Sequence, residues 1–251
     1  MQLINDDFLN TSLTSKSVDL LLTDLPYGVI NKKKNTWDTI IPFDKFWTFV
    51  DKVCKPNAAI ISTAKNPFTA QLISSNYKMF KYCWVWEKSR STGWLDCKKM
   101  PLRAHEDIVV FYKQLPTYNP QMVDGITNDK GIYSRDTLCY GKINKTLPVK
   151  NESGKRFPRS VLYFRTAESE GKWHATQKPV ALYEYLIKTY SNEGDTILDP
   201  CMGSGTTGLA CLNTNRKFIG IEKEPDIYSK ALERFKLHEN NRIKDISILE
   251  A

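Results

Sequence analysis

The sequence predicts an α/β protein with a doubly wound, Rossmann-like fold, and three observations support that prediction. Short apolar runs alternate along the chain with segments of helical periodicity. Several of these runs are almost continuously apolar, which is typical of parallel strands buried on both faces. A glycine-rich turn joins one apolar run to a helix near residue 205. A turn of this kind leaves the free N–H groups of a helix N-terminus open to a ligand.

The expected elements follow from these patterns in chain order. Strands are predicted over residues 2–4, 18–23, 58–63, 82–87, 107–112, 196–198 and 217–221. Helices are predicted over residues 8–17, 43–53, 68–74, 179–190, 206–212 and 226–238, and a last short strand over 246–249. In the second of these helices, Phe46, Val50 and Val53 recur at helical spacing. Strands that alternate with helices favour a parallel sheet with helices on both faces.

The composition favours a globular protein with a polyanionic partner. The 251 residues suit one large domain, or one domain with a sizeable insertion. The net charge of +8 makes nucleic acid the first partner to consider. The six cysteines include no Cys-x-x-Cys pair and the three histidines are far apart, so no metal site is expected. We see neither an apolar run of membrane-spanning length nor a signal-peptide pattern, and expect a cytoplasmic location.

Periodicity fades between residues 114 and 172, and this stretch is predicted to be an insertion. Residues 1–113 and 173–251 are then expected to be two parts of one domain. Long irregular stretches in compact domains are usually functional or disordered, and an ordinary surface loop is the alternative. Basic and aromatic residues are interleaved here, which suits contact with nucleic acid. The candidate nucleic-acid contacts are Lys155, Arg156 and Arg159 in this stretch, with Lys32, Lys33, Lys34 and Arg103 outside it.

Two motifs follow predicted strands directly. Gly203-x-Gly205-x-x-Gly208 comes after the strand at 196–198, and Glu222 ends a later strand 19 residues on (222 − 203). This is close to the spacing of a dinucleotide-binding fingerprint, so a nicotinamide-dependent oxidoreductase and a glycine turn without a ligand both stay open. The second motif, Asp24-Leu25-Pro26-Tyr27-Gly28, ends the strand at 18–23. Ligands bind at the carboxyl ends of strands in open α/β sheets, and an oxidoreductase would leave this second motif unexplained.

Three motifs together resemble those of the beta class of DNA amino-methyltransferases. Asp199-Pro200-x-x-Gly203-x-Gly205-Thr206 resembles their S-adenosylmethionine loop, and Asp24-Leu25-Pro26-Tyr27 resembles their catalytic Asp-Pro-Pro-Tyr. His174-Ala175-Thr176-Gln177-Lys178-Pro179 is similar to their His-Pro-Thr-Gln-Lys-Pro segment. The catalytic motif comes first and the cofactor loop last, which is the circularly permuted order of that class. The resemblance spans almost the whole chain, and it implies that residues 114–172 are a target-recognition insertion.

The resemblance also implies a cofactor, partners and site residues. The cofactor would be S-adenosyl-L-methionine and the partner double-stranded DNA; a homodimer and a cognate restriction endonuclease are compatible with it. Leucine stands at position 25 in place of the family's first proline, but the backbone carbonyl survives, so activity is expected. The implied catalytic residues are Asp24, Leu25, Pro26 and Tyr27. The implied cofactor contacts are Asp7, Phe8, Thr176, Lys178, Asp199, Cys201, Gly203, Ser204, Gly205, Thr206 and Glu222, the last of which would take the ribose hydroxyls.

The chemistry of the catalytic motif suits an exocyclic amine. The lone pair of such an amine is delocalised into the ring, and acceptors on its hydrogens, from Asp24 and from the Leu25 carbonyl, would make it reactive. Tyr27 offers a ring on which a flipped base can stack. The predicted reaction is direct, in-line methyl transfer to adenine N6 in duplex DNA, without a metal or a covalent intermediate. Cys201 after Pro200 resembles a cytosine-C5 nucleophile, but a small residue beneath the cofactor is the simpler interpretation.

Other functions stay open at this point. Cytosine-N4 methylation has nearly the same chemistry, but relatives of that kind usually carry serine at the position of Asp24. Methylation of RNA or of a protein glutamine is a further alternative, and the net charge of +8 argues against a protein substrate. Asp24, Pro26 and Tyr27 argue against a catalytically inactive DNA-binding module. His105-Glu106 can be read as a helper near the target base, although a structural polar pair is the simpler interpretation.

Overall fold

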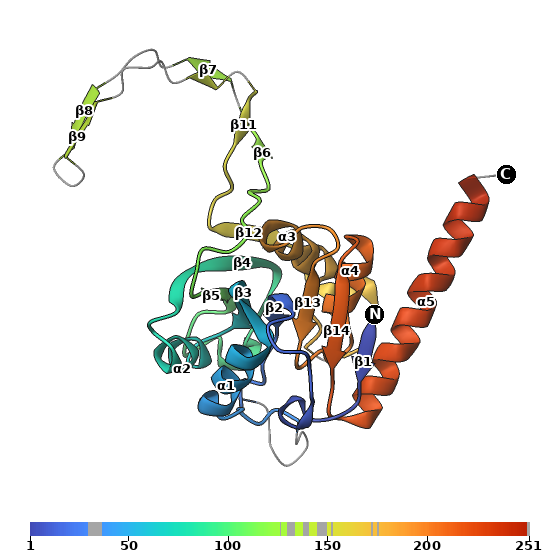
Figure 1. Cartoon of the computed structure of the whole chain (residues 1–251). Coiled ribbons are helices and arrows are strands. Elements are labelled where there is room, and N and C mark those ends of the chain that lie inside the picture. Colours follow the sequence, from blue (N-terminus) through green and yellow to red (C-terminus); the bar gives the residue numbers. More distant parts are fainter. Residues whose placement is uncertain are drawn as a thin grey trace. The chain divides into compact units, whose positions relative to one another are not determined.

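A mixed eight-stranded sheet forms the centre of the computed structural model (Figure 1). The structure describes residues 1–29, 37–125, 127–129, 134–137, 141–144, 150–151, 153–171, 173–174 and 176–249. In spatial order the strands are β1 (Gln2–Ile4), β14 (Lys217–Ile221), β13 (Thr196–Asp199), β2 (Val18–Thr23), β3 (Cys54–Ala64), β5 (Arg103–Phe111), β4 (Phe80–Thr92) and β12 (Val161–Phe164). Only β5 is antiparallel to its neighbours, and the other adjacent pairs are parallel.

Helices cover both faces of this sheet, as the alternation of strands and helices predicts. On one face, α1 (Phe43–Val53), α2 (Phe68–Ser75) and the short 3-10 helix η1 (Phe8–Asn10) share a hydrophobic core with Leu21 and Ile60. On the other, α3 (Val180–Tyr190), α4 (Thr206–Asn213) and α5 (Pro225–Leu249) share a core with Leu20, Leu22 and Ile61. Successive residues of β2 therefore enter opposite cores, which explains the apolar run at residues 20–22.

The middle of the sheet positions the two motifs side by side. β2 and β13 are parallel neighbours, with Leu21 paired to Leu198. Each motif begins where its strand ends, because Asp24 follows Thr23 and Asp199 is the last residue of β13. The carboxyl ends of neighbouring parallel strands lie at the same edge of a sheet. Two segments that are far apart in sequence are thus brought together at that edge.

Two element predictions are wrong. Residues 8–17 form only η1, because the chain is extended again at Thr11 and the Lys16 and Ser17 N–H groups donate to Lys52 O and Val53 O. The Asp7 carboxylate caps the start of η1 by accepting from the Leu9 N–H (2.9 Å). The strand expected over residues 246–249 is instead the last part of α5. A strand needs a neighbouring edge for its backbone hydrogen bonds, whereas a helix satisfies them within itself. None of the described helices is both long and apolar enough to cross a membrane.

The irregular stretch contains a second compact unit, Pro120–Arg159, which is narrower than the predicted insertion at 114–172. Its described residues form nested antiparallel strand pairs: β6 (Val123–Asp124) with β11 (Lys155–Arg156), β7 (Asn128–Asp129) with β10 (Lys150–Asn151), and β8 (Ser134–Thr137) with β9 (Gly141–Asn144). After this unit the chain returns to the main sheet, where β12 pairs with β4. β12 is an edge strand that the sequence did not predict.

Candidate active site

A direct hydrogen bond at the carboxyl edge of the sheet joins the end of β2, just before the first motif, to Asp199 of the second motif. The Thr23 hydroxyl, at the end of β2, donates to Asp199 Oδ1 at 2.7 Å. Thr207 Oγ1 at the start of α4 donates to the other oxygen at 2.5 Å, and the Cys201 N–H donates to Oδ1 at 3.1 Å. The oxygens of the buried Asp199 carboxylate therefore accept hydrogen bonds from the loop and from the neighbouring strand. It fixes the shape of the glycine turn relative to Asp24.

Asp24 accepts three hydrogen bonds from groups on separate elements. Its Oδ1 accepts from Tyr27 Oη (2.6 Å) and from Thr63 Oγ1 at the end of β3 (2.5 Å). Among the described residues, its Oδ2 accepts only from Lys178 Nζ, at 2.5 Å. A carboxylate oxygen offers about two acceptor positions. Both positions on Oδ1 are therefore filled, and Oδ2 is the oxygen that can receive a further donor.

Lys178 lies between two acidic side chains. Its ammonium is paired with Asp24 and lies 3.6 Å from Glu106 Oε2 on β5. Glu106 Oε1 in turn accepts from Lys88 of β4 at 3.2 Å. Burial alone would lower the pKa of Lys178, but the charges of Asp24 and Glu106 outweigh it and the pKa is raised. Lys178 is consequently a charged, buried ammonium at the catalytic motif.

This position of Lys178 differs from the one that the sequence resemblance implies. Its ammonium contacts the catalytic motif, and its backbone carbonyl accepts from Thr206 Oγ1 of the glycine turn at 3.2 Å. One residue thus touches both motifs.

Thr63, Glu106 and Lys88 also belong to the site. The sequence raised only Glu106, and as a secondary alternative. Their shared signal is a polar side chain in a strand, at the edge of the sheet where β3 ends and the antiparallel β5 begins.

Tyr27 is held in a fixed orientation against the helical layer. Its ring stacks on Phe68 of α2, with centroids 5.0 Å apart and planes inclined by 29°. Lys178 Nζ lies 5.6 Å and Lys65 Nζ 5.9 Å from the same ring centroid. Burial, followed by the charge of Asp24, raises the pKa of Tyr27 well above its usual value. The phenol stays protonated and donates to Asp24.

The motif departs from the family pattern at Leu25. The contacts of Leu25 and Gly28 hold the backbone of the motif in place. The Leu25 side chain is buried in the core that includes α1 and α2, so an apolar residue fits in place of proline. Gly28 has a φ of +69° and its N–H donates to Asp38 Oδ1 at 2.9 Å. A positive φ favours glycine. Pro26 is half-buried between these two anchored positions.

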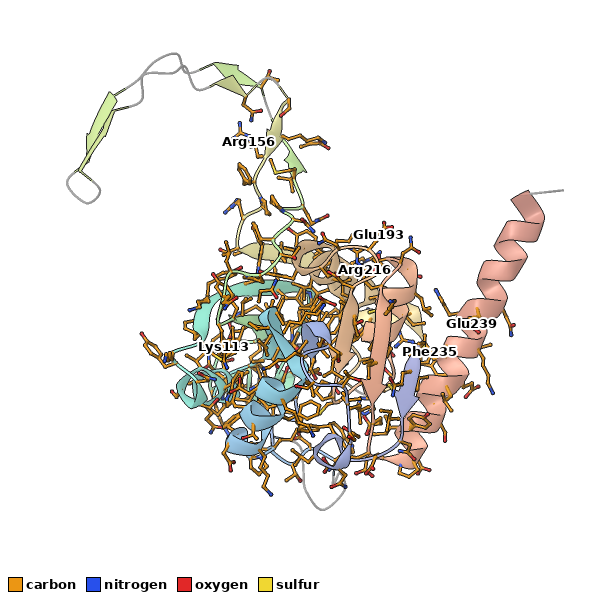
Figure 2. The ribbon with its side chains drawn as sticks, viewed as in Figure 1. Lys113, Arg156, Glu193, Arg216, Phe235 and Glu239 are labelled. Atoms are coloured by element: carbon orange, nitrogen blue, oxygen red, sulfur yellow. The ribbon has the colours of Figure 1, made fainter. Side chains whose placement is uncertain are left out.

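The three glycines of the turn serve two different purposes. A Cβ at Gly203 (φ +51°) would meet no atom within 4 Å, so this residue borders open space. Added at Gly205 or Gly208, a Cβ would lie 2.5 Å from Cζ of Phe235. Phe235 points from α5 toward the sheet, and its ring centroid is 6.4 Å from that of Phe218 (Figure 2). Gly203 therefore leaves space beside the turn. The absence of a Cβ at Gly205 and Gly208 lets Phe235 of α5 pack against the turn.

Glu222 closes on the same turn from the end of β14. Its Oε2 accepts from the Gly203 N–H at 3.0 Å and its Oε1 from the Glu224 N–H at 2.9 Å. The side chain is buried, and burial raises its pKa. A carboxylate beside an open backbone turn is a suitable acceptor for vicinal hydroxyls. Glu222 and Gly203 are therefore the parts of the turn that fit a nucleoside-containing cofactor best.

Arg234 of α5 donates hydrogen bonds to the glycine turn. The sequence did not predict this role of Arg234. Its guanidinium is 4% exposed, and Nη1 donates to Ser204 O (3.1 Å), Ser204 Oγ (3.3 Å) and Thr206 Oγ1 (3.0 Å). Nη2 is paired with Glu170 at 3.4 Å, and Glu170 also accepts from the Val180 N–H at 3.0 Å. Ala231, Arg234 and Phe235 share one buried helical stripe. An arginine on an apolar stripe was the available signal.

The remaining predicted cofactor residues lie in different surroundings. Phe8 is buried, and its ring centroid is 4.8 Å from that of Phe49, so it belongs to the core. Asp7 caps η1. Thr176 is exposed and its hydroxyl lies 3.0 Å from His174 Nδ1. The pKa of the Cys201 thiol is raised well above its usual value, first by burial, which disfavours a thiolate nucleophile.

The candidate DNA contacts lie in two places. Arg103 is exposed at the start of β5, beside a turn whose Trp94 side chain is 74% exposed. In the second unit Arg156 and Arg159 are exposed, and Lys155 is ion-paired with Asp124 at 2.5 Å. Lys32, Lys33 and Lys34 lie outside the described residues. Within the described part of the chain no group of side chains is arranged to hold a metal ion.

Asp199 should make folding stability depend on pH. Burial raises its pKa from 3.8 to about 7, so between these values the folded protein holds a proton that the unfolded chain has released. Stability should therefore fall as the pH rises from about 4 to 7, by up to about 1.4 kcal/mol per pH unit from this group. Asp199→Asn, which resembles the protonated form, should lack this component in urea unfolding between pH 4.5 and 8.

The matched control for that experiment is Glu193→Gln, which alters an exposed carboxylate (Figure 2). Its unfolding free energy should follow that of the unaltered protein at every pH. The difference in unfolding free energy between the Asp199→Asn variant and the unaltered protein should grow with pH in favour of the variant. Parallel curves for all three proteins would mean that Asp199 does not titrate in this window.

Comparison with known proteins shows the family. A model for N6/N4 DNA methylases matches residues 18–233. Among curated relatives, the type II methyltransferase M.HpaI of Haemophilus parainfluenzae is 29% identical over 237 residues, which cover 89% of this chain and 69% of that protein. The DNA adenine methyltransferase YhdJ of Escherichia coli is also 29% identical over 237 residues, with 88% and 77% covered.

Solved structures show the same fold at lower identity. The PvuII DNA methyltransferase, described as cytosine-N4-specific, superposes with a TM-score of 0.63 at 19% identity and covers 92% of this chain and 84% of that one. The M1.HpyAVI–SAM complex gives 0.61 at 22% identity, with 93% and 98% covered. These likenesses confirm the predicted Rossmann-like α/β class.

Proposed function

The chain belongs to the N6/N4 DNA methylase family, and on that premise we propose that it methylates adenine N6 in duplex DNA with S-adenosyl-L-methionine as the methyl donor. The observation that carries the proposal is the acceptor arrangement at Asp24, where Oδ1 is filled by two hydroxyls and Oδ2 is shared only with Lys178. Adenine is preferred over cytosine because an aspartate opens the motif and because one relative at 29% identity is described as a DNA adenine methyltransferase. Cytosine N4 is the alternative.

The residues around the glycine turn fit the cofactor. Gly203 borders open space, the Glu222 carboxylate lies beside it, and Arg234 holds the turn from the opposite side. We propose that Glu222 takes the ribose hydroxyls and that the backbone from Cys201 to Thr206 holds the methionine portion. When bound, S-adenosyl-L-methionine supplies a methyl group already activated by its sulfonium charge. The protein therefore has to supply alignment rather than a further catalyst.

At the other end of the site, the protein prepares the amine. Asp24 Oδ2 accepts a hydrogen bond from the exocyclic N–H, and this keeps the nitrogen lone pair directed away from the ring. Tyr27 and Thr63 hold the carboxylate in place through Oδ1. As the nitrogen gains its methyl group it must lose one proton, and the Asp24 carboxylate is the base in contact with it. The target adenine must flip out of the DNA duplex to reach this edge of the sheet.

Methyl transfer into unmethylated genomic DNA tests the function. The purified protein is incubated with labelled S-adenosyl-L-methionine, the DNA is digested to nucleosides, and the products are separated by mass and retention. N6-methyladenine is the expected product. N4-methylcytosine would overturn the base assignment while keeping the site. Cofactor binding without a DNA product would contradict the proposed substrate, and parallel assays with RNA and protein would then identify another one.

A further inference from the structure

Glu106 presents a buried oxygen, Oε2, whose interaction with Lys178 is a long ion pair rather than a hydrogen bond. Its Oε2 is buried and has no hydrogen-bond partner among the described residues. Oε1 is held by Lys88, whose side chain is only 6% exposed, so the carboxylate is kept in one orientation. Oε2 then faces Lys178 Nζ at 3.6 Å, just beyond hydrogen-bond length. A buried, unsatisfied carboxylate oxygen is costly and calls for an explanation.

The resting position of Lys178 conflicts with the chemistry at Asp24. The ammonium donates to Oδ2, the oxygen of Asp24 that still has an acceptor position for an incoming amine. In the transition state the target nitrogen becomes positive as it takes the methyl group. A second positive charge on the same carboxylate oxygen opposes that change, because like charges a few ångströms apart repel strongly in a buried site. The ammonium therefore has a reason to leave Asp24 when the amine arrives.

We propose that Lys178 occupies Asp24 only until the target amine enters, and that Glu106 Oε2 then receives the displaced ammonium. Lys178 is the resident donor that satisfies Asp24 at rest, and Glu106 is a positioning residue that acts through Lys178. This inference rests on the proposed function, because it requires an amine that binds at Asp24. No bond forms or breaks in the exchange; one hydrogen bond of the ammonium is replaced by another.

The surroundings of Lys178 allow the required movement and little else. Its backbone is anchored at the glycine turn through the contact from Thr206 Oγ1, and Val180 begins α3 two residues later. The flexible four-carbon stem can still redirect the ammonium between oxygens on either side of it. Because the pairs Lys178–Asp24 and Lys178–Glu106 come from different elements, the exchange does not need a change in the sheet.

Single-turnover methylation of the DNA fragment that the unaltered protein modifies is the test. Four proteins are compared: unaltered, Glu106→Gln, Lys178→Met and the double variant. Glu106→Gln should leave the ammonium on Asp24 and slow transfer by on the order of 10²-fold, the size expected for a misplaced catalytic group. In the double variant the blocking ammonium is gone. Its rate should equal that of Lys178→Met and exceed that of Glu106→Gln.

Two results would overturn the proposal. One is a methylation rate in the double variant that is lowered by the product of the two single-variant factors. The other is an unchanged rate in Glu106→Gln. The control is Glu87→Gln, which removes an exposed carboxylate from the neighbouring strand and should keep the full rate. Cofactor affinity should be the same in all variants. Should Glu106→Gln fail to fold, Glu106→Asp keeps the charge for Lys88 but lengthens the path from Lys178, and a loss of rate is again expected. Absence of DNA methylation by the unaltered protein would instead count against the proposed function.

Discussion

Asp24→Ala is expected to abolish methyl transfer while leaving cofactor binding intact. The substitution removes the carboxylate that accepts hydrogen bonds from Tyr27, Thr63 and Lys178. The target amine then has neither its acceptor nor its base, and a loss of about 10²- to 10⁴-fold in rate is the usual size of such an effect. The glycine turn does not depend on Asp24, because its contacts come from Asp199, Glu222 and Arg234.

The experiment measures single-turnover transfer and cofactor affinity on the same preparations. Lys178 keeps Glu106 as a partner in the variant, so the buried ammonium is not left alone and the fold should survive. Asp24→Asn keeps one acceptor oxygen without the charge and should fall between the alanine variant and the unaltered protein. Asp44→Ala, at an exposed carboxylate on α1, is the control and should be fully active. Full activity in Asp24→Ala would remove Asp24 from the mechanism.

Arg234→Met is expected to cost both stability and cofactor binding. The guanidinium is buried and satisfies Ser204 O, Ser204 Oγ and Thr206 Oγ1, with Glu170 as its counter-charge. Removing one partner of a buried pair typically costs about 3–5 kcal/mol, and because the Glu170 side chain is 26% exposed we expect the lower end of that range. Glu170 also accepts from the N-terminal N–H of α3, so the loss should spread to the segment that carries Lys178.

Urea unfolding and cofactor titration separate the two parts of this prediction. The unfolding free energy should drop by several kcal/mol, and cofactor affinity should fall at temperatures where the variant is still folded. Lys236→Met removes an exposed positive charge two residues along the same helix and should change neither quantity. Destabilisation with unchanged cofactor affinity would show that Arg234 supports the fold and has no separate part in shaping the turn.

The sequence predicted the central strands and both motifs because their signals are local. Val18–Thr23 is apolar on both faces, which only a buried strand requires. Asp24 and the glycine turn each follow such a strand directly, so their place at the carboxyl edge followed from the parallel arrangement. Leu25 was noted as a departure from the family pattern, and its burial in the core accounts for it.

The sequence could not reveal contacts that depend on elements far apart in the chain. Glu106 and Lys178 meet only because β5 lies antiparallel beside β3. Arg234 reaches the turn only because Gly205 and Gly208 let α5 approach through Phe235. The family resemblance predicts Gly205 as a cofactor contact, whereas Gly208 enters the sequence argument only as the last glycine of the dinucleotide fingerprint. β12 was missed because its four residues gain their partner from β4, not from any sequence neighbour.

The pairing of β2 with β13 has a consequence for how the chain reaches its native state. Leu21 finds its partner Leu198 only after 177 further residues (198 − 21) have been synthesised. Until then one edge of β2 stays unpaired, with an apolar face on each side. Contacts between such distant residues carry a large loop-closure cost, and proteins dominated by them fold slowly. The part of the sheet from β2 to β4 is therefore synthesised before β13, the strand that pairs with β2. A chain truncated before β13 would expose an apolar edge prone to aggregation.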